Sequence, residues 1–251
     1  MVKVGIELIV FQGREREDLD GVLKDCAEAG YDSVETGFIF DKYRPQQIRE
    51  VFEKYHLEYA AGHGGYDTIG NEAKLEETIK NIKDAGGSYI ICSGVAKGEG
   101  SAGYKEAAKV FNKVGKLAED AGLIFCYHNH SSEFEIVEGK KGIDILGEET
   151  DANLVKFNVD TAWVQVGGEE PAQFIQRYRD RVGYYHFKDA FIKGKEITWT
   201  ELGKGDVNLR PAYEMAMRFN PAYFIYEEDV SRIEIKQAIK ESREFLKGLG
   251  V

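Results

Sequence analysis

Short apolar runs alternate along the chain with longer stretches in which apolar residues recur at helical spacing. The runs are too apolar for strands with one solvent-exposed face, so they predict strands covered on both sides. We expect strands at residues 2–10, 31–34, 57–61, 88–92, 123–127, 153–159, 182–185 and 223–226. We expect helices at residues 16–29, 45–55, 75–82, 104–121, 143–149 and 233–249, with two more that begin at Pro171 and Pro211.

Strand and helix therefore alternate through all 251 residues. Eight such units in about 250 residues are typical of a (β/α)8 TIM barrel. An open doubly wound sheet would normally carry a glycine-rich phosphate loop after its first strand, whereas residues 11–18 read FQGRERED. The sequence contains no linker or low-complexity segment. We predict an α/β fold that is a single TIM barrel domain over residues 1–251.

Composition restricts the partners that the chain can have. Its net charge is −11 and no cluster of Lys and Arg is present, which argues against a nucleic-acid or anionic-membrane surface. No apolar run approaches the roughly 20 residues of a membrane span, and the N-terminus lacks a signal-peptide pattern. Cys26, Cys92 and Cys126 are widely spaced and odd in number, as expected of buried thiols. We expect a cytoplasmic protein. The sequence does not decide whether it forms a homo-oligomer.

Ionisable residues concentrate at the C-terminal ends of the predicted strands. Eight of them lie at or just past these ends: Glu7, Glu35, His63, His128, His130, Asp160, His186 and Glu227. In a TIM barrel these strand ends form one mouth, and active sites lie there. The eight residues are therefore candidates for a common site.

The order of several short motifs resembles the sugar phosphate isomerase/epimerase family of the xylose isomerase-like TIM barrels. The matching pieces follow successive predicted strands: YHNH at 127–130, NVDT at 158–161, HFKD at 186–189, ELGKGDVNL at 201–209 and YEED at 226–229. The match extends over nearly the whole chain and is most specific from Leu123 onward. The resemblance implies one divalent metal with four protein ligands: His128, Asp160, His186 and Glu227.

Two imidazoles and two carboxylates suit a borderline cation, with Mn²⁺ expected first and Zn²⁺, Co²⁺, Fe²⁺ or Mg²⁺ as the other candidates. The chain departs from the family at His128, where most members have Glu, and at Trp163, where many epimerases have His. Glu133 is an alternative ligand or base. If His128 ligates through a neutral imidazole, metal binding should weaken as the pH falls through roughly 6.

The resemblance implies an enzyme that acts on a keto sugar or related small polyol beside a metal-chelated carbonyl. Glu227, His128 and Lys188 are the candidate catalytic residues, with Glu227 as the proton shuttle. The candidate substrate-binding residues are Glu7, Glu35, His63, His130, Glu133 and Trp163. The first two of these could equally form structural ion pairs. Lys188 could polarise a carbonyl or bind an anionic group, or it could pair with Asp189 or Glu201.

The sequence does not distinguish between two reactions that both begin with removal of a proton from the carbon beside the carbonyl. Return of the proton gives isomerisation or epimerisation, which is the main prediction. Departure of a β-leaving group gives a metal-dependent lyase, such as an inosose or keto-sugar dehydratase or a 3-keto-glycoside eliminase. Two other classes are an endonuclease IV-like hydrolase, which needs more His and Asp ligands, and a non-catalytic sugar-binding barrel, which needs no metal. We therefore expect a small-molecule sugar as the partner.

Overall fold

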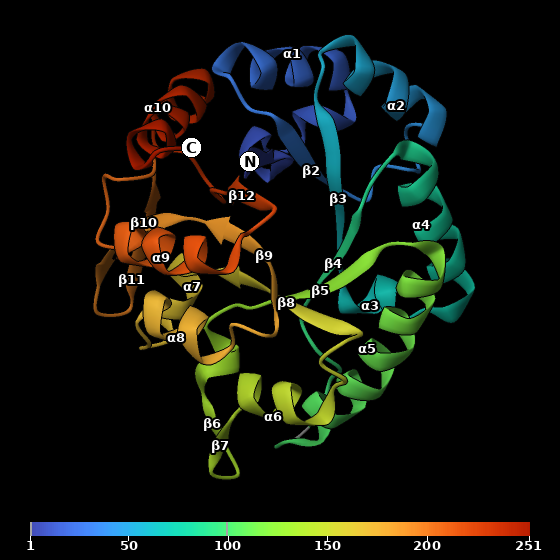
Figure 1. Ribbon diagram of the computed structural model, residues 1–251, viewed down its shortest axis with the longest axis vertical. Coiled ribbons are helices and arrows are strands. Elements are labelled where there is room, and N and C mark those ends of the chain that lie inside the picture. The colour runs from blue at the N-terminus through green and yellow to red at the C-terminus, as the bar shows by residue number, and fades with distance from the viewer. Residues whose placement is uncertain (1, 99) are drawn as a thin grey trace.

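The chain folds into a closed barrel of parallel strands surrounded by helices (Figure 1). The computed structural model describes residues 2–98 and 100–251. Around the barrel the strands follow the order β1-β12-β9-β8-β5-β4-β3-β2. Their bounds are β1 Lys3–Glu7, β2 Ser33–Gly37, β3 Glu58–Gly65, β4 Tyr89–Ser93, β5 Ile124–His128, β8 Val155–Asp160, β9 Val182–Phe187 and β12 Tyr223–Tyr226. The predicted TIM barrel and its eight strands are confirmed.

A helix on the outside of the barrel follows each of these strands (Figure 1). These helices are α1 Leu19–Ala29, α2 Pro45–Lys54, α4 Glu72–Ala85, α5 Ala102–Ala121, α6 Gly142–Glu149, α8 Pro171–Arg177, α9 Leu209–Ala216 and α10 Ile235–Leu249. Two further helices, α3 Tyr66–Ile69 and α7 Thr161–Val166, were not predicted because they are too short to show helical periodicity. No helix in the described part of the chain is long and apolar enough to cross a membrane.

Several predicted boundaries differ from the structure: β3 ends at Gly65 rather than at residue 61, so His63 lies within this strand, and α1 begins at Leu19 rather than at residue 16. Two further differences have a clear local cause. Strand β1 ends at Glu7 rather than at residue 10, because the Glu7 side chain accepts a hydrogen bond from Ile9 N at 2.7 Å and caps a 3-10 helix, η1 Leu8–Phe11. Helix α9 begins at Leu209 rather than at Pro211. Proline is tolerated anywhere in the first helical turn, where its missing N–H has no helical partner, so it does not fix the first residue.

Two antiparallel hairpins extend from the C-terminal side of the barrel, and neither was predicted. Strands β6 Ile136–Val137 and β7 Lys140–Lys141 form a small hairpin after β5. Strands β10 Asp189–Lys193 and β11 Glu196–Thr200 form a longer one after β9. Gly194, at φ +63°, makes its turn, a backbone conformation that favours glycine.

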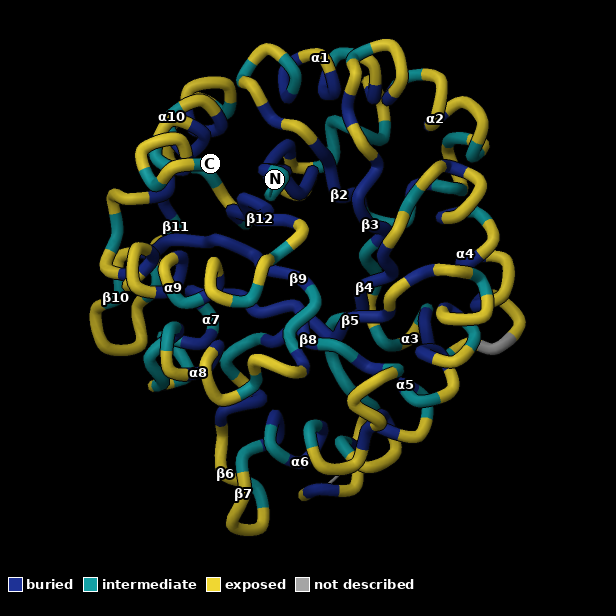
Figure 2. Tube along the Cα trace, in the orientation of Figure 1, coloured by how far each residue is buried: buried dark blue, intermediate teal, exposed yellow. Residues whose placement is uncertain are grey.

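The barrel interior has an apolar layer beneath a polar layer, because alternate residues of a strand face the same side. The lower layer is a separate buried cluster that includes Ala61, Ile91, Cys126, Tyr184, Tyr223 and Ile225. For five of the strands, the residue two positions after a member of this cluster is polar: His63, Ser93, His128, His186 and Glu227. The other three strands end in Glu7, Asp160 and, close to the end of β2, Glu35. Figure 2 shows the barrel strands as mostly buried. The apolar layer therefore closes the barrel below a group of ionisable side chains.

Candidate metal centre

Four buried side chains from adjacent strands meet in the upper layer of the barrel. His128 ends β5, Asp160 ends β8, His186 lies near the end of β9, and Glu227 directly follows β12. One potential ligand atom from each of the four lies within 4.8 Å of the others. We call these four residues the metal group, because together they could hold a metal ion. They are the same four residues that the family resemblance implied.

Asp160 tests whether a cation fits this group. Its Oδ1 accepts a hydrogen bond from Trp163 N at 2.8 Å, whereas its buried Oδ2 has no hydrogen-bond partner among the described residues. Burial raises the pKa of Asp160 to about 7, although the charge of Lys188 opposes the shift. A buried carboxylate oxygen without a partner is unfavourable, and a cation would satisfy it. The donors present therefore fit a divalent ion.

His186 is held between two carboxylates. Its Nε2 lies 3.0 Å from Oε2 of Glu35, and its Nδ1 contacts Oε2 of Glu227. Burial lowers the pKa of His186, but the charges of Glu35 and Glu227 outweigh burial and hold the pKa well above its ordinary value. A cation in the metal group would therefore compete with the proton on Nδ1.

His128 has the opposite protonation. Burial lowers the pKa of His128 well below its ordinary value despite the opposing charge of Glu227. The imidazole is therefore neutral near pH 7, and the predicted pH dependence of metal binding moves from His128 to other members of the group. Nδ2 of Asn158 lies 3.3 Å from Nδ1 of His128, while Oδ1 of Asn158 has no partner among the described residues. Turning this amide over would let Oδ1 accept an Nδ1–H and leave Nε2 of His128 bare.

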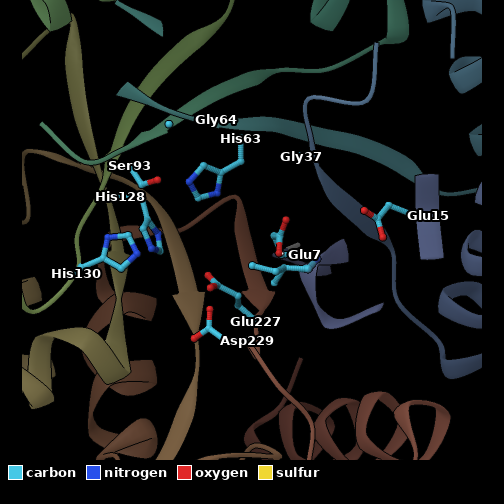
Figure 3. Close-up of a pocket in the computed structure, with 12 residues that line it drawn as sticks. Glu7, Glu15, Gly37, His63, Gly64, Ser93, His128, His130, Glu227 and Asp229 are labelled. Carbon is cyan, nitrogen blue, oxygen red and sulfur yellow. Dashed lines mark hydrogen bonds between the residues drawn. The ribbon is translucent and has the colours of Figure 1, made fainter. Parts of the chain in front are cut away.

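A cavity of about 290 Å³ shares His128 and Glu227 with the metal group. It is lined by Glu7, Ile9, Glu15, Gly37, His63, Gly64, Gly65, Ser93, His128, His130, Glu227 and Asp229. Figure 3 shows the three histidines on one side of the cavity, Glu7 and Glu15 on the other, and Glu227 between them. Sequence reasoning missed Ser93 and Glu15. The end of β4 was an available signal for Ser93, whereas Glu15 lies in a 3-10 helix, η2 Arg14–Arg16, and had no such signal.

Two carboxyl groups of this cavity have opposite protonation states. Burial raises the pKa of Glu7 well above its ordinary value, and the charges of Glu35 and Glu227 add to the shift. Burial also acts to raise the pKa of Glu227, but the charges of Lys188 and His186 outweigh it and hold the pKa well below the ordinary value. Glu7 therefore tends to hold a proton where Glu227 is ionised, which is how environments separate acid from base.

Lys188 is fully buried beside the metal group. Its Nζ lies 3.0 Å from Oε1 of Glu227 and 2.5 Å from Oδ2 of Asp229. The same ammonium group lies 4.3 Å from the ring centroid of Trp199 and 5.1 Å from that of Trp163. Opposing carboxylates and aromatic faces both stabilise a buried cation, so Lys188 is fixed as a charge partner of Glu227.

Lys188 does not form the ion pair with Asp189 or Glu201 that the sequence suggested as an alternative. The Asp189 carboxylate instead accepts hydrogen bonds from four backbone N–H groups, that of Ala190 at 2.9 Å and those of Gly203, Gly205 and Val207 at 2.8, 3.0 and 3.2 Å. A Cβ on Gly205 would lie 2.3 Å from Oδ1 of Asp189, so only glycine allows this approach. The motif at residues 201–209 therefore forms a loop that Asp189 holds beside the site.

Three predicted substrate-binding residues are absent from the described lining of the cavity: Glu35, Glu133 and Trp163. Glu133 accepts hydrogen bonds from the Tyr127 hydroxyl at 2.7 Å and from His130 N at 2.9 Å, so it holds the loop after β5. Trp163 packs against His130 with ring centroids 5.3 Å apart. The substrate contacts of these residues stay predictions, whereas Glu7, His63 and His130 do line the cavity.

The fold and the metal group define a TIM barrel with a candidate metal centre at the C-terminal mouth. Residues 23–249 match the family model described as xylose isomerase-like TIM barrel, and the chain belongs to this family. The chain is 28% identical over 196 residues to an inosose dehydratase of Geobacillus kaustophilus, and the alignment covers 68% of this chain and 61% of that protein. It is 24% identical to an inosose dehydratase of Mesomycoplasma hyopneumoniae, with 99% and 96% covered.

Solved structures share the same fold. A sugar phosphate isomerase/epimerase from Parabacteroides distasonis matches with a TM-score of 0.82 at 19% identity, over 98% of this chain and 94% of that one. The IOLI protein, whose crystal structure is described as having a bound zinc atom, matches with a TM-score of 0.78 at 14% identity, over 99% and 98%. At these identities the likeness shows the fold alone.

Proposed function

We propose that this protein is a divalent-metal-dependent lyase that removes water from a keto polyol of the inosose class. The observation that carries the proposal is the buried metal group beside a cavity whose opposite side carries Glu7. The names of the two inosose dehydratases support the reaction type. We expect one ion in each chain, Mn²⁺ first, and the zinc of the IOLI protein belongs to the same set of borderline candidates.

The chain's own residues would carry the proton transfers. When bound, the ion would supply a Lewis acid that polarises the ketone and makes the adjacent C–H group more acidic. Glu227 accepts that proton, and Lys188 balances the charge of its carboxylate from 3.0 Å. Glu7 donates its proton to the hydroxyl on the next carbon. A C–H and a C–O bond break, a C=C bond forms, and water leaves; solvent then restores both carboxyl groups.

Dehydration fits these protonation states better than epimerisation does. An epimerase needs a second group that exchanges a proton with the same carbon from the opposite face. In the family this role is associated with a Glu at the position of His128, whose imidazole is neutral and has a lowered pKa. Glu7 is instead a proton donor at the start of the cycle, as a leaving hydroxyl group requires. The isomerase reading remains the second candidate, because it begins with the same proton abstraction.

The charges around the cavity favour an uncharged substrate. The described lining contains four acidic residues, Glu7, Glu15, Glu227 and Asp229, and neither Lys nor Arg. Lys188 lies nearby, but Glu227 and Asp229 already neutralise it. A phosphate or carboxylate on the substrate would therefore meet no free cation among these residues, whereas the hydroxyl groups of a polyol can bond to carboxylates and imidazoles.

A substrate panel in D₂O tests the proposal. Mn²⁺-loaded protein is incubated with inososes, linear ketoses and 3-keto glycosides, and products are followed by NMR and mass spectrometry. We expect an inosose to lose one water. Glu7→Gln should slow this loss by about 10²–10⁴, because it removes the acid, while exchange of the α-proton continues at Glu227.

Asp25→Asn is the matched control for this experiment. Asp25 is a buried carboxylate of α1, paired with Arg14 and Lys236 outside the barrel, so this variant should dehydrate at the wild-type rate. Products with the mass of the substrate would instead establish the isomerase or epimerase reading. Loss of a glycoside leaving group, without loss of water, would identify the eliminase.

A further inference from the structure

Glu35 lies outside the cavity lining, yet it contacts two histidines of the site. We infer that this one carboxylate fixes the tautomers of both rings in opposite senses. It leaves His186 with a bare Nδ1 for the metal group and His63 with a bare Nε2 for the cavity. Glu35 is then a positioning residue rather than a substrate ligand. The part that concerns His186 rests on the metal centre of the proposed function.

The geometry of the three side chains carries this inference. Glu35 is fully buried in β2. Its Oε1 lies 2.9 Å from Nδ1 of His63, and its Oε2 lies 3.0 Å from Nε2 of His186. An ionised carboxylate can only accept hydrogen bonds, so both of these ring nitrogens carry hydrogen. A neutral imidazole has a single N–H, so Nε2 of His63 is bare. Nδ1 of His186 becomes bare when a cation in the metal group takes the place of its proton.

The bare nitrogen of His186 points to the metal group. Its Nδ1 is the atom that contacts Glu227, and it would ligate a cation there in place of a proton. A histidine ligand that donates its second N–H to a carboxylate keeps one tautomer and one ring orientation, and it becomes a stronger ligand. Glu35 would thus act on the metal through His186 without touching it.

The bare nitrogen of His63 serves the cavity instead. His63 lines the cavity, and Figure 3 shows its ring directed into it. Its ring centroid lies 5.1 Å from that of His128, so the imidazole stands beside the metal group without belonging to it. With Nδ1–H committed to Glu35, Nε2 can accept a hydrogen bond from a substrate hydroxyl. A bare Nε2 would bind a substrate hydroxyl, which can donate a hydrogen bond, but not a carbonyl oxygen, which can only accept one.

A second metal ion is the alternative explanation for Glu35, His63 and His186, because their ligand atoms are also close enough to hold one. Hydrogen bonding argues against it. Each Glu35 oxygen already has a ring N–H within 3.0 Å, whereas Oδ2 of Asp160 has no partner among the described residues. Protons therefore satisfy this group, and we call it the Glu35 group.

Glu35→Gln tests the inference, because an amide offers one acceptor oxygen and one donor nitrogen. It cannot accept from both rings, so at least one histidine should change its tautomer. ¹⁵N NMR of the imidazoles in Zn²⁺-loaded protein reports this directly. Titration with Co²⁺, followed by absorption, should show metal affinity reduced by about 10–100-fold. Asp25→Asn is the matched control, since it alters a buried carboxylate that pairs with Arg14 and Lys236 outside the barrel and contacts neither ring, and it should change neither result.

The wild-type spectrum tests the assignment even if the variant folds poorly. An Nε2–H tautomer for His63, or an Nδ1–H tautomer for His186 in the Zn²⁺-loaded protein, would overturn it. Unchanged tautomers and affinity in folded Glu35→Gln would also overturn it. A wild-type protein that binds no Co²⁺ would instead remove the proposed metal centre and the His186 part with it, while the tautomer of His63 would still decide the rest.

Discussion

The metal group and the Glu35 group share His186 and contain the same kinds of side chain, but they differ in whether their carboxylate oxygens have hydrogen-bond partners. In the Glu35 group both carboxylate oxygens have ring nitrogens at 2.9 and 3.0 Å. In the metal group Oδ2 of Asp160 has no partner among the described residues, and its pKa is raised to about 7. Proximity alone therefore does not separate a cation site from a proton-filled network, whereas unsatisfied acceptors do.

The largest expected effect concerns the chemistry of the metal group. Glu227→Gln should lower turnover by about 10²–10⁴, because the amide keeps an oxygen donor but cannot accept the proton. The measurement is deuterium uptake at the α-carbon of the substrate, in protein whose metal content has been confirmed. Exchange at the wild-type rate in the metal-loaded variant would reduce Glu227 to a ligand and direct the search for the base elsewhere.

The second expected effect is on the pH dependence of metal affinity, which depends on the ligands that must lose a proton before they bind the ion. The pKa of His186 lies well above its ordinary value and that of Asp160 is about 7, while that of His128 lies well below its ordinary value. A cation must displace protons from the first two, so affinity should fall below about pH 7 by up to tenfold per pH unit for each proton displaced. Calorimetric titration of metal at several pH values measures this. An affinity that stays constant down to pH 6 would contradict these assignments.

The smallest expected effect is on the stability of the metal-free protein. The folded-state pKa of Asp160 is raised, so its contribution to stability is present below about pH 4 and is lost as the pH rises towards 7. Asp160→Asn keeps the acceptor for Trp163 N and removes the unpaired charge. At pH 8 it should be more stable than metal-free wild type by roughly 1–3 kcal/mol, measured by urea unfolding.

The pH comparison supplies the control for that measurement. The difference between Asp160→Asn and metal-free wild type should shrink as the pH falls from 8 through 7 towards 4, because the carboxyl group of folded wild type, with its pKa of about 7, becomes protonated over this range. A variant that is less stable than wild type at pH 8 would mean that the Asp160 charge is already compensated.

The sequence was sufficient to predict the barrel, and the family resemblance selected the four residues of the metal group from the eight ionisable residues at strand ends. Strand ends carry His128, Asp160, His186 and Glu227, and parallel strands bring such ends together in any closed barrel. Short elements such as α3, α7 and the two hairpins escaped prediction, because a few residues show no periodicity. The early end of β1 also escaped prediction, because it depends on a single hydrogen bond by which the Glu7 side chain caps η1.

Partnerships within the site could not be predicted, because they join residues far apart in the chain. Glu35 and His186 are 151 positions apart, and nothing local indicates that one accepts from the other. Lys188 is adjacent to Asp189 in sequence, yet it pairs with Glu227 and Asp229, since the Asp189 carboxylate is used by a loop. Protonation states depend on such contacts, so the separate states of Glu7 and Glu227 emerge only from the structure.

Metal stoichiometry tests the contrast between the two groups most directly. After reconstitution with Mn²⁺ and removal of excess ion, elemental analysis should find about one ion per chain in wild type, as a single four-ligand site requires. His63→Ala, which changes only the Glu35 group, should retain that ion, and Asp160→Ala should lose most of it. No ion in wild type, or an ion lost from His63→Ala and retained in Asp160→Ala, would contradict the account.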